Sequence, residues 1–161
     1  PRRSTQGVSS AASDVYKRLG EITPGVVDEE LGISTDLLPT LLDMTGVGLL
    51  PEQHVDGQSL WPVIRNRTSI NRETLFWHFP HYSGSGAIPG AAIRNGDDKL
   101  IWWFEDNAIE LYDLNNDLGE QNNLAKQYPK LAGDLKTQLE IWLEEIGARM
   151  TAPNPEWQSG Q

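Results

Sequence analysis

Residues 91–104 read AAIRNGDDKLIWWF and decide the fold expected for the second half of the chain. Two mainly apolar runs, Ala91–Arg94 and Lys99–Phe104, have the composition of strands. They flank Asn95-Gly96, a strong hairpin signal because both residues tolerate the positive φ of a two-residue turn. The additional Asp97-Asp98 indicates a longer loop or a bulge. The segment therefore predicts a β-hairpin.

Neighbouring segments extend this hairpin into a sheet. Glu73–Phe79 and Ala108–Leu114 have strand character, and Pro129 opens a long helix that runs to about Gly147. The helix carries an apolar stripe formed by Tyr128, Leu131, Leu135, Leu139, Trp142, Leu143 and Ile146. A few strands alone are marginally stable, so the stripe is expected to cover them. The prediction is an α+β fold, a small antiparallel sheet of three to four strands covered by a long C-terminal helix.

The first half of the chain predicts two short helices. Ile33–Gly46 has N-cap residue types at its start, Pro39 in its first turn and glycine after its end. Its apolar face is expected to be buried and consists of Leu37, Leu38, Leu41, Leu42 and Thr45. Ser59–Arg65 is the second helix. Four segments are therefore expected: an irregular N-terminal segment (1–32), short helices (33–66), the α+β subdomain (67–150) and a tail (151–161).

Composition excludes several classes of function. The 161 residues carry a formal net charge of -10 without a basic run, which disfavours nucleic acid as a partner. There is no cysteine, and thus no disulfide, thiolate metal site or cysteine nucleophile. No apolar run reaches the length of a membrane span. The chain begins with Pro1 rather than methionine, so we expect a cut or processed N-terminus.

The most site-like stretch is Leu75–Tyr82, LFWHFPHY. Pro80 cannot donate to a sheet ladder, so the strand should end there. His78, His81 and Tyr82 would then lie at a strand end beside a glycine-rich loop, a common place for ligand contacts. The alternative is a packed strand whose imidazoles are satisfied by hydrogen bonds. A separation of three along a strand sends the two imidazoles to opposite faces, and two ligands are too few for a metal site.

No complete catalytic set is visible in the sequence. Asp113, Asn115 and Asp117 imitate the start of a calcium-binding EF-hand loop, but the glycine is one position late and Leu124 occupies the position of the bidentate glutamate. We interpret these residues as an Asx-rich turn before the long helix. The carboxylates elsewhere show no catalytic spacing.

Six segments, taken in order, resemble the C-terminal region of type I sulfatases, arylsulfatase-like members of the alkaline-phosphatase superfamily. They are STDLLPTLLD (34–43), DGQSL (56–60), LFWHFPHY (75–82), AIRNGDDKLI (92–101), ELYDL (110–114) and DLGEQNNL (117–124). The resemblance covers about Pro24 to Trp157.

The resemblance implies a large α/β catalytic domain that precedes this region, with residues 33–66 at the junction between the two. The family's nucleophile is a formylglycine made from a C/S-x-P-x-R motif, and its metal is calcium. The motif is absent here. Both cofactors are therefore expected in the preceding domain, and this chain alone should be inactive. Export to a periplasm or the outside of the cell is usual for such enzymes.

For the candidate site, the resemblance implies a role at the rim of the substrate cleft. His78, His81 and Tyr82 would contact a sulfated small molecule or glycan, and Arg94 is a further candidate for binding an anion. The alternative for Arg94 is a hairpin-end residue paired with an acid.

Three hypotheses follow. The first is the C-terminal portion of a sulfatase, which predicts an exposed apolar surface around Leu37–Met44 and Trp61 where the large domain would pack. The second is a stand-alone, non-catalytic binding module, which requires Leu37–Met44 to be buried within this chain. The third, a hydrolase that uses the histidines, lacks both a nucleophile and a metal set.

Overall fold

The computed structural model describes residues 22–23, 25–66, 68–84 and 86–152. The chain divides into two compact units between Arg72 and Glu73. Most of the predicted N-terminal segment (1–32) and of the predicted tail (151–161) lies outside the described residues. Within the described part of the chain, no helix has both the length and the apolar character needed to cross a membrane.

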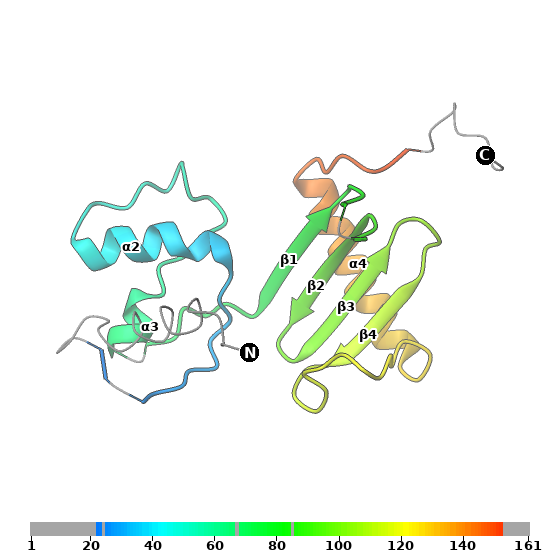
Figure 1. Cartoon of the computed structure of the whole chain (residues 1–161), viewed down its shortest axis with the longest axis horizontal. Helices are drawn as coiled ribbons and strands as arrows, with labels where there is room; N and C mark the ends of the chain where they lie inside the picture. The colour runs from blue at the N-terminus through cyan, green and yellow to red at the C-terminus, as the bar shows by residue number, and fades with distance from the viewer. Residues whose placement is uncertain (1–21, 24, 67, 85, 153–161) are drawn as a thin grey trace, which may run out of the picture. The chain divides into compact units, whose positions relative to one another are not determined.

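The second unit consists of a four-stranded sheet and one long helix (Figure 1). The strands are β1 (Thr74–Phe79), β2 (Gly90–Asn95), β3 (Asp98–Trp103) and β4 (Ile109–Asp113), and they lie in this order with every pair antiparallel. Helix α4 (Pro129–Glu145) lies against one face of the sheet. The predicted α+β fold, with a small antiparallel sheet under a C-terminal helix, is confirmed.

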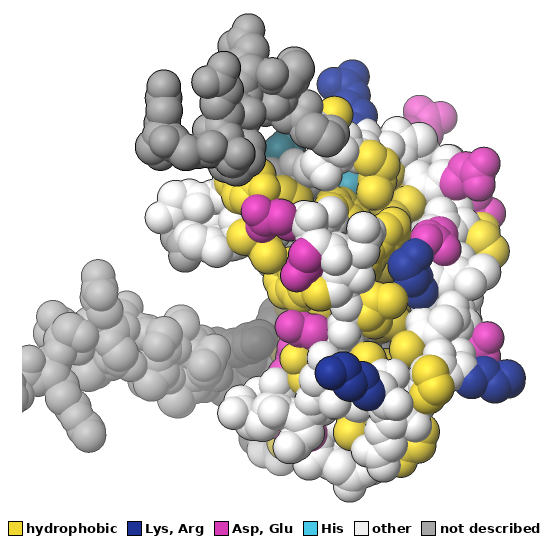
Figure 2. Space-filling view, turned by 90° about the vertical axis from the view of Figure 1, so that its right-hand side faces the viewer, with side chains coloured by type: hydrophobic (Ala, Val, Ile, Leu, Met, Phe, Trp, Pro, Cys, Tyr) yellow, Lys and Arg dark blue, Asp and Glu magenta, His cyan; other side chains and the backbone are white. Residues whose placement is uncertain are grey.

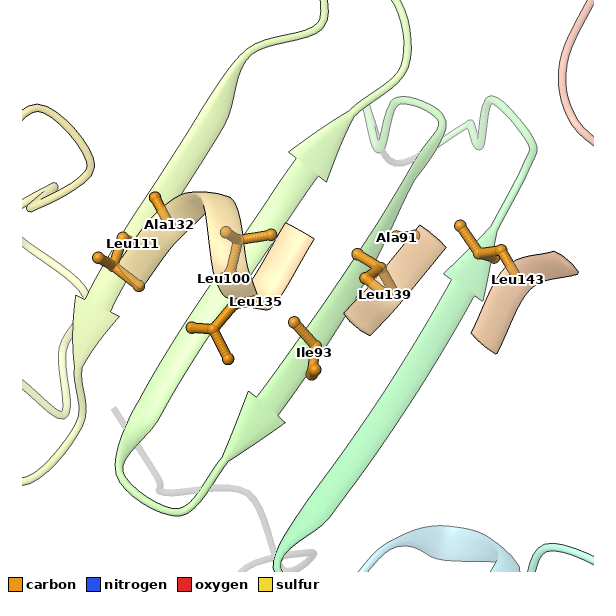
Figure 3. Close-up of a cluster of buried hydrophobic side chains, with 8 residues drawn as sticks. All are labelled: Ala91, Ile93, Leu100, Leu111, Ala132, Leu135, Leu139 and Leu143. Atoms are coloured by element: carbon orange, nitrogen blue, oxygen red, sulfur yellow. The ribbon is translucent and has the colours of Figure 1, made fainter. Parts of the chain in front are cut away.

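The core of this unit lies between the sheet and α4 (Figure 3). Alternate strand positions and the i, i+4 positions of the helix bring together Ala91, Ile93, Leu100, Leu111, Ala132, Leu135, Leu139 and Leu143. Burial of each large side chain contributes roughly 1.5–3 kcal/mol. The predicted apolar stripe is confirmed at its centre but wrong at its ends. Tyr128 and Ile146 are the caps of α4, where the sheet no longer covers them, and both are about half exposed.

The β2–β3 hairpin is tighter than predicted. Asn95 pairs with Asp98, which leaves Gly96 and Asp97 as a two-residue loop. Gly96 has a φ of 58° at the first loop position, where a type II′ turn requires glycine. The predicted hairpin is therefore confirmed, whereas the assignment of Asn95 to the turn and the expected longer loop or bulge are wrong.

The first unit contains the short elements η1 (Ser34–Asp36), α2 (Leu37–Thr45) and α3 (Trp61–Asn66). Pro39 lies in the first turn of α2, and Gly46 ends the helix with a φ of 72°. These elements agree with the predicted helices to within two residues at each end.

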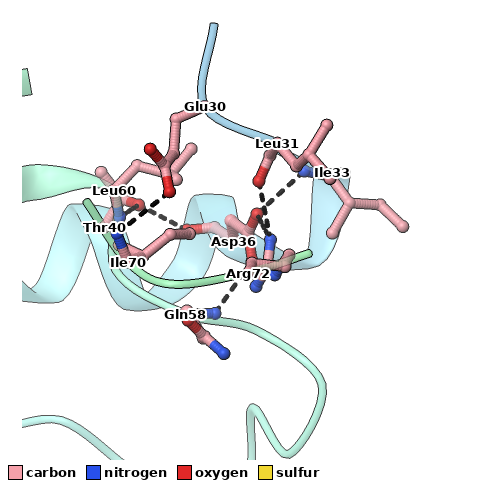
Figure 4. Close-up of polar contacts among 9 residues, drawn as sticks. All are labelled: Glu30, Leu31, Ile33, Asp36, Thr40, Gln58, Leu60, Ile70 and Arg72. Atoms are coloured by element: carbon pink, nitrogen blue, oxygen red, sulfur yellow. Dashed lines mark hydrogen bonds and ion pairs between the residues drawn. The ribbon is translucent and has the colours of Figure 1, made fainter. Parts of the chain in front are cut away.

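Asp36 is fully buried and joins segments that are distant in the sequence (Figure 4). Its carboxylate accepts hydrogen bonds from the backbone N–H groups of Ile33 (2.8 Å) and Gln58 (2.9 Å). The guanidinium of Arg72 donates to both carboxylate oxygens, at 2.5 and 2.8 Å. Burial alone would raise the pKa of Asp36, but these hydrogen bonds and the positive charge of Arg72 outweigh it and lower the pKa below its ordinary value.

The apolar side chains of α2 are only partly buried within this chain. Leu37 and Leu41 are 63% and 57% exposed, whereas Pro39 and Thr40 are buried. The expectation of a buried leucine face is therefore wrong for this chain by itself. The surface predicted by the first hypothesis is confirmed for these leucines and wrong for Trp61, which is buried.

The outer edge of β4 is covered by the chain that follows it. The side chain of Asn123 accepts a hydrogen bond from the backbone N–H of Leu111 (3.2 Å) and donates one to the carbonyl of Ile109 (3.3 Å). The N–H of Leu124 donates to the carbonyl of Leu111 (2.8 Å). An amide side chain and one peptide group thus take the place of a fifth strand.

Candidate functional site

The end of β1 carries three of the four predicted site residues. The strand stops at Phe79, directly before Pro80, as predicted. His81 and Tyr82 follow it in a loop, where both are exposed. A proline thus ends the ladder and leaves the next two side chains at the surface.

His78 lies inside β1 and faces the layer of α4. It pairs with Ala91 of the core, and Phe76, two residues earlier, stacks on Trp142 of α4 with ring centroids 4.8 Å apart. The imidazole lies 5.8 Å from the ring of Phe104, centroid to centroid. Its Nε2 is buried and has no hydrogen-bond partner among the described residues. The alternative of a fully satisfied imidazole is therefore wrong for this nitrogen.

The surroundings of His78 favour its neutral form. Burial lowers the pKa of His78, and the charge of nearby His81 lowers it further. In the folded protein His78 is thus a packed, neutral imidazole at neutral pH.

We expect His78→Phe to leave the free energy of unfolding unchanged at pH 7 or to raise it by up to about 1 kcal/mol, because an unsatisfied buried nitrogen is removed. With a lowered folded-state pKa, His78 costs the wild type stability as the pH falls below about 6.5, since the unfolded chain binds a proton that the folded chain does not. The difference in free energy of unfolding between variant and wild type, measured by urea unfolding, should therefore grow in favour of the variant from pH 7 to pH 5.5. Tyr128→Phe, at a position about half exposed and without a group that titrates in this pH range, is the control. A smaller gain at pH 5.5 than at pH 7 contradicts the prediction.

His81 and Tyr82 form the accessible part of the site. The ring of His81 meets the ring of Phe79 edge-on, with centroids 5.7 Å apart. The phenol of Tyr82 hydrogen-bonds to Glu105, and Tyr82 is 68% exposed. Loss of solvent contact, followed by the charge and the hydrogen bond of Glu105, raises the pKa of Tyr82. This loop therefore presents an imidazole and a neutral phenol to an incoming ligand.

Arg94 lies at the other end of the sheet. It pairs with Leu75 at the start of β1, whereas Phe79 pairs with Gly90. Gly90 and Arg94 are four positions apart along β2, which corresponds to about 13 Å. The Nε of Arg94 donates to the carbonyl of Gly96 in the hairpin turn (2.9 Å). The structure thus brings His81 and Tyr82 together and leaves Arg94 apart from them.

The face of the sheet opposite α4 is concave and apolar. A cavity of about 540 Å³ is lined by Trp77 and Phe79 from β1 and by Ile101 and Trp103 from β3, with Leu114 and Leu118 beside them. Figure 2 shows hydrophobic side chains gathered in a hollow of the surface, with acidic and basic side chains around it. This face is not among the sites predicted from the sequence. The sequence does contain a pattern that indicates it. LFWHF, apart from His78, and LIWWF are apolar at successive rather than alternate positions, as in strands that are covered on both faces.

Among the described residues, no group of three or more His, Asp or Glu side chains is arranged to hold a metal ion. His81 and Tyr82 offer hydrogen bonds and aromatic surface.

Comparisons with known proteins agree on one family. The family described as "N-sulphoglucosamine sulphohydrolase, C-terminal" matches residues 15–145. A protein named Sulfatase from Formosa agariphila is 36% identical over 144 residues, which cover 80% of this chain and 26% of that protein. Delta 4,5-hexuronate-2-O-sulfatase from Bacteroides thetaiotaomicron is 32% identical over 113 residues, which cover 67% of this chain and 23% of that protein.

A solved structure gives the same result. BT4656, in complex with its substrate D-glucosamine-2-N,6-O-disulfate, is 30% identical with a TM-score of 0.57, over 70% of this chain and 24% of that chain. This chain spans about a quarter of the length of the curated relatives that it matches. With the family matched over residues 15–145 and the sheet and helix in place, the chain belongs to the family of N-sulphoglucosamine sulphohydrolase C-terminal domains and corresponds to a C-terminal part of sulfatases.

Proposed function

We propose that this chain is the C-terminal part of an enzyme that hydrolyses sulfate esters, called the parent protein below. The observation that carries the proposal is the family match over residues 15–145, in relatives that are about four times as long as the matched region. The coding region upstream tests it directly. A C/S-x-P-x-R motif there is expected, and a natural start codon immediately before Pro1 would contradict the proposal.

The cofactors of the parent protein would belong to the domain that precedes this chain. A formylglycine would supply the nucleophile there, and calcium would be the metal. The residues of this chain would bind and orient the substrate and complete the fold.

We place the substrate-binding rim at His81 and Tyr82. Both side chains are exposed at the end of β1, and the hydrogen bond to Glu105 orients the phenol of Tyr82. An imidazole can bind a hydroxyl or an anionic group, and an aromatic ring can stack on a sugar. His78 would act as a positioning residue, because its packed ring fixes the strand from which His81 emerges.

Sulfated carbohydrate is the substrate class that this arrangement favours. Two of the relatives carry names that specify a sulfated sugar, a hexuronate 2-O-sulfate and a glucosamine disulfate. Arg94 remains a predicted anion-binding residue. Because it lies about 13 Å along the sheet from the end of β1, only a substrate of several sugar units could contact both.

The preceding domain is also the proposed partner of α2. Leu37, Leu38 and Leu41 are exposed on this helix, and apolar side chains that gather on one surface mark an interaction site. The hypothesis of a stand-alone module requires these leucines to be buried within the chain, so their exposure supports the sulfatase hypothesis instead.

The rim is tested by kinetics of the parent protein. We expect His81→Ala and Tyr82→Ala each to raise KM for D-glucosamine-2-N,6-O-disulfate about 10-fold, the effect of one lost hydrogen bond or stacking contact, with kcat within about 2-fold. KM for a small aryl sulfate should change much less, since it lacks the sugar hydroxyls and the second sulfate group that the rim would bind. Tyr128→Ala, at another exposed tyrosine, is the control. An unchanged KM for both substrates in both variants contradicts the proposed rim.

A further inference from the structure

We infer that Asn95 is a deamidation site that the folded sheet keeps unreactive and that local opening of the β2–β3 hairpin makes reactive. Asn95-Gly96 is the only Asn-Gly pair in the sequence. Asparagine is among the thermally labile residues, and a glycine that follows it leaves the attacking backbone nitrogen unshielded, because glycine has no Cβ. The inference concerns covalent ageing of the chain and does not depend on the activity proposed above.

The modification needs no reagent except water. The backbone nitrogen of Gly96 gives up its proton and attacks Cγ of Asn95, which forms an N–Cγ bond and closes a five-membered succinimide ring. The Cγ–Nδ2 bond breaks, and the amide group takes up a proton and leaves as ammonia. Water then opens the ring at one of its two carbonyl carbons. The product is aspartate or isoaspartate at position 95, with no change of oxidation state.

Both reacting groups are held by hydrogen bonds in the folded structure. The backbone N–H of Gly96 donates to the carbonyl of Glu73 (2.8 Å), which makes its proton harder to remove. The Nδ2 of Asn95, which is the leaving group, donates to Oε1 of Gln138 on α4 (3.3 Å). The nucleophile and the leaving group are therefore each fixed by a partner outside the hairpin.

The sheet also fixes the backbone of Asn95. This residue is the last of β2, and it pairs with Thr74 of β1 on one side and with Asp98 of β3 on the other. Ring closure requires a rotation about the Cα–C bond of Asn95, which turns its side chain toward the nitrogen of Gly96. Pairing on both sides holds Asn95 extended and opposes that rotation, so the reactive geometry is reached only when this end of the sheet opens.

The end of the sheet that contains Asn95 is a place where opening costs little. In Figure 1 the turn between β2 and β3 lies beside the start of β1. Glu73, whose carbonyl protects Gly96, is exposed, directly precedes β1 and is the first residue of the second unit. Gly96 and Asp97 are exposed as well. Because the ends of elements open at a lower free energy than core strands, deamidation should proceed without unfolding of the core.

Deamidation adds a negative charge where the chain already has several. Asn95 lies opposite Asp98 across the hairpin, and like charges directly opposite each other destabilise a strand pair. Burial and the charges of Asp113 and Asp97 already raise the pKa of Asp98. Isoaspartate in addition lengthens the backbone by one methylene at the end of β2 and disturbs the strand register. Each product thus weakens the hairpin end that shielded Asn95.

Peptide mapping of the full-length protein by mass spectrometry tests the inference. At one temperature and pH, deamidation of Asn95 should be at least about 10-fold slower in the folded protein than in guanidinium chloride, because only the opened fraction reacts. Asn71, which is exposed and is followed by Arg72 instead of glycine, is the internal control and should react slowly in both states.

A substitution in α4 tests the contact of the leaving group. Gln138→Ala should raise the rate in the folded protein about 3-fold, the effect of one lost hydrogen bond, and leave the rate in guanidinium chloride unchanged. Gln138 is exposed, so the variant keeps the core intact. Thr137→Ala is the matched control and should leave both rates unchanged, since Thr137 is also exposed and its hydroxyl donates to Gly133 within α4.

A second pair of variants tests the consequence of the modification. Asn95→Asp reproduces the charge of the aspartate product. It should lower the melting temperature by a few degrees relative to Asn95→Ser, a neutral replacement that also removes the amide.

Four results overturn the inference. Equal rates in the folded and the unfolded protein mean that the sheet gives no protection. The absence of deamidation in both states means that Asn95 is not a modification site. Equal rates for Gln138→Ala and Thr137→Ala mean that α4 does not hold the leaving amide. Equal melting temperatures for Asn95→Asp and Asn95→Ser mean that the product does not weaken the hairpin.

Discussion

Asp36→Ala is expected to lower the free energy of unfolding of the first unit by about 3–5 kcal/mol, the cost of breaking a buried ion pair on one side. The substitution leaves the guanidinium of Arg72, whose side chain is 6% exposed, without its carboxylate. It also removes the acceptor of two backbone N–H groups, those of Ile33 and Gln58. Hydrogen exchange of residues 33–45 and 58–65, followed by mass spectrometry, measures the loss.

Two further variants serve as controls for this prediction. Asp134→Ala removes a carboxylate from an ion pair with Lys130 whose side chains are 61% and 93% exposed, and it should cost less than about 1 kcal/mol. The double variant Asp36→Leu/Arg72→Met should recover part of the loss, because no buried charge is left unpaired, although the N–H groups of Ile33 and Gln58 stay unsatisfied. Equal losses for Asp36→Ala and Asp134→Ala contradict the assigned role of Asp36.

The pH dependence of the first unit follows from the same group. The folded-state pKa of Asp36 lies below its ordinary value, so the unfolded chain binds a proton more readily than the folded one. The stability that ionised Asp36 contributes to the first unit is fully present above about pH 4. It is lost as the pH falls through the folded-state pKa. Asp36→Ala should show no such loss in acid.

Leu139→Ala is expected to lower the free energy of unfolding of the second unit by about 2–5 kcal/mol. Leu139 is fully buried at the centre of the layer between α4 and the sheet, together with Ile93 and Leu100. Truncation removes apolar contacts and leaves a cavity that the strands, fixed by their pairing, cannot close. Urea unfolding measured through hydrogen exchange of residues 90–103 gives the value.

Ile141→Ala provides the comparison on the same helix. Ile141 is about half exposed on the other side of α4, so the same kind of truncation should cost less than about 1 kcal/mol. Similar losses at positions 139 and 141 would mean that α4 does not present Leu139 to the sheet.

Local signals predicted most of the elements of this fold. Pro80 ends β1 and Pro129 begins α4 because proline fixes φ and has no N–H to donate, and Gly46 ends α2 because glycine adopts a φ of 72° without strain. The Asx-rich turn is confirmed as well. The carboxylate of Asp113 accepts hydrogen bonds from the backbone N–H groups of Asn115 and Asn116. The carboxylate of Asp117 likewise accepts one from the N–H of Gln121.

Features that depend on distant partners could not be predicted. The pairing of Asp36 with Arg72 joins residues 36 positions apart, and no local pattern indicates it. The ring of His78 packs against Phe104, a residue of a later loop. The distance between Arg94 and His81 follows from strand register, which places Leu75 rather than Phe79 beside Arg94. For the candidate site, the sequence therefore predicted the residue types and the strand end, but not which side chains share a surface.

The closure of β4 by Asn123 has a consequence for how the protein behaves at high concentration. An edge strand offers unpaired N–H and C=O groups that can nucleate intermolecular β-sheet, the first step of aggregation. At β4 the groups of Ile109 and Leu111 are already occupied, so another molecule finds no template there. Because the sheet order is β1-β2-β3-β4, any added strand must join at β1, which Pro80 stops from growing longer. The sheet is thus protected against polymerisation at its β4 edge. A fibril requires growth from both edges, and this growth is blocked by a single amide side chain and the turn that carries it.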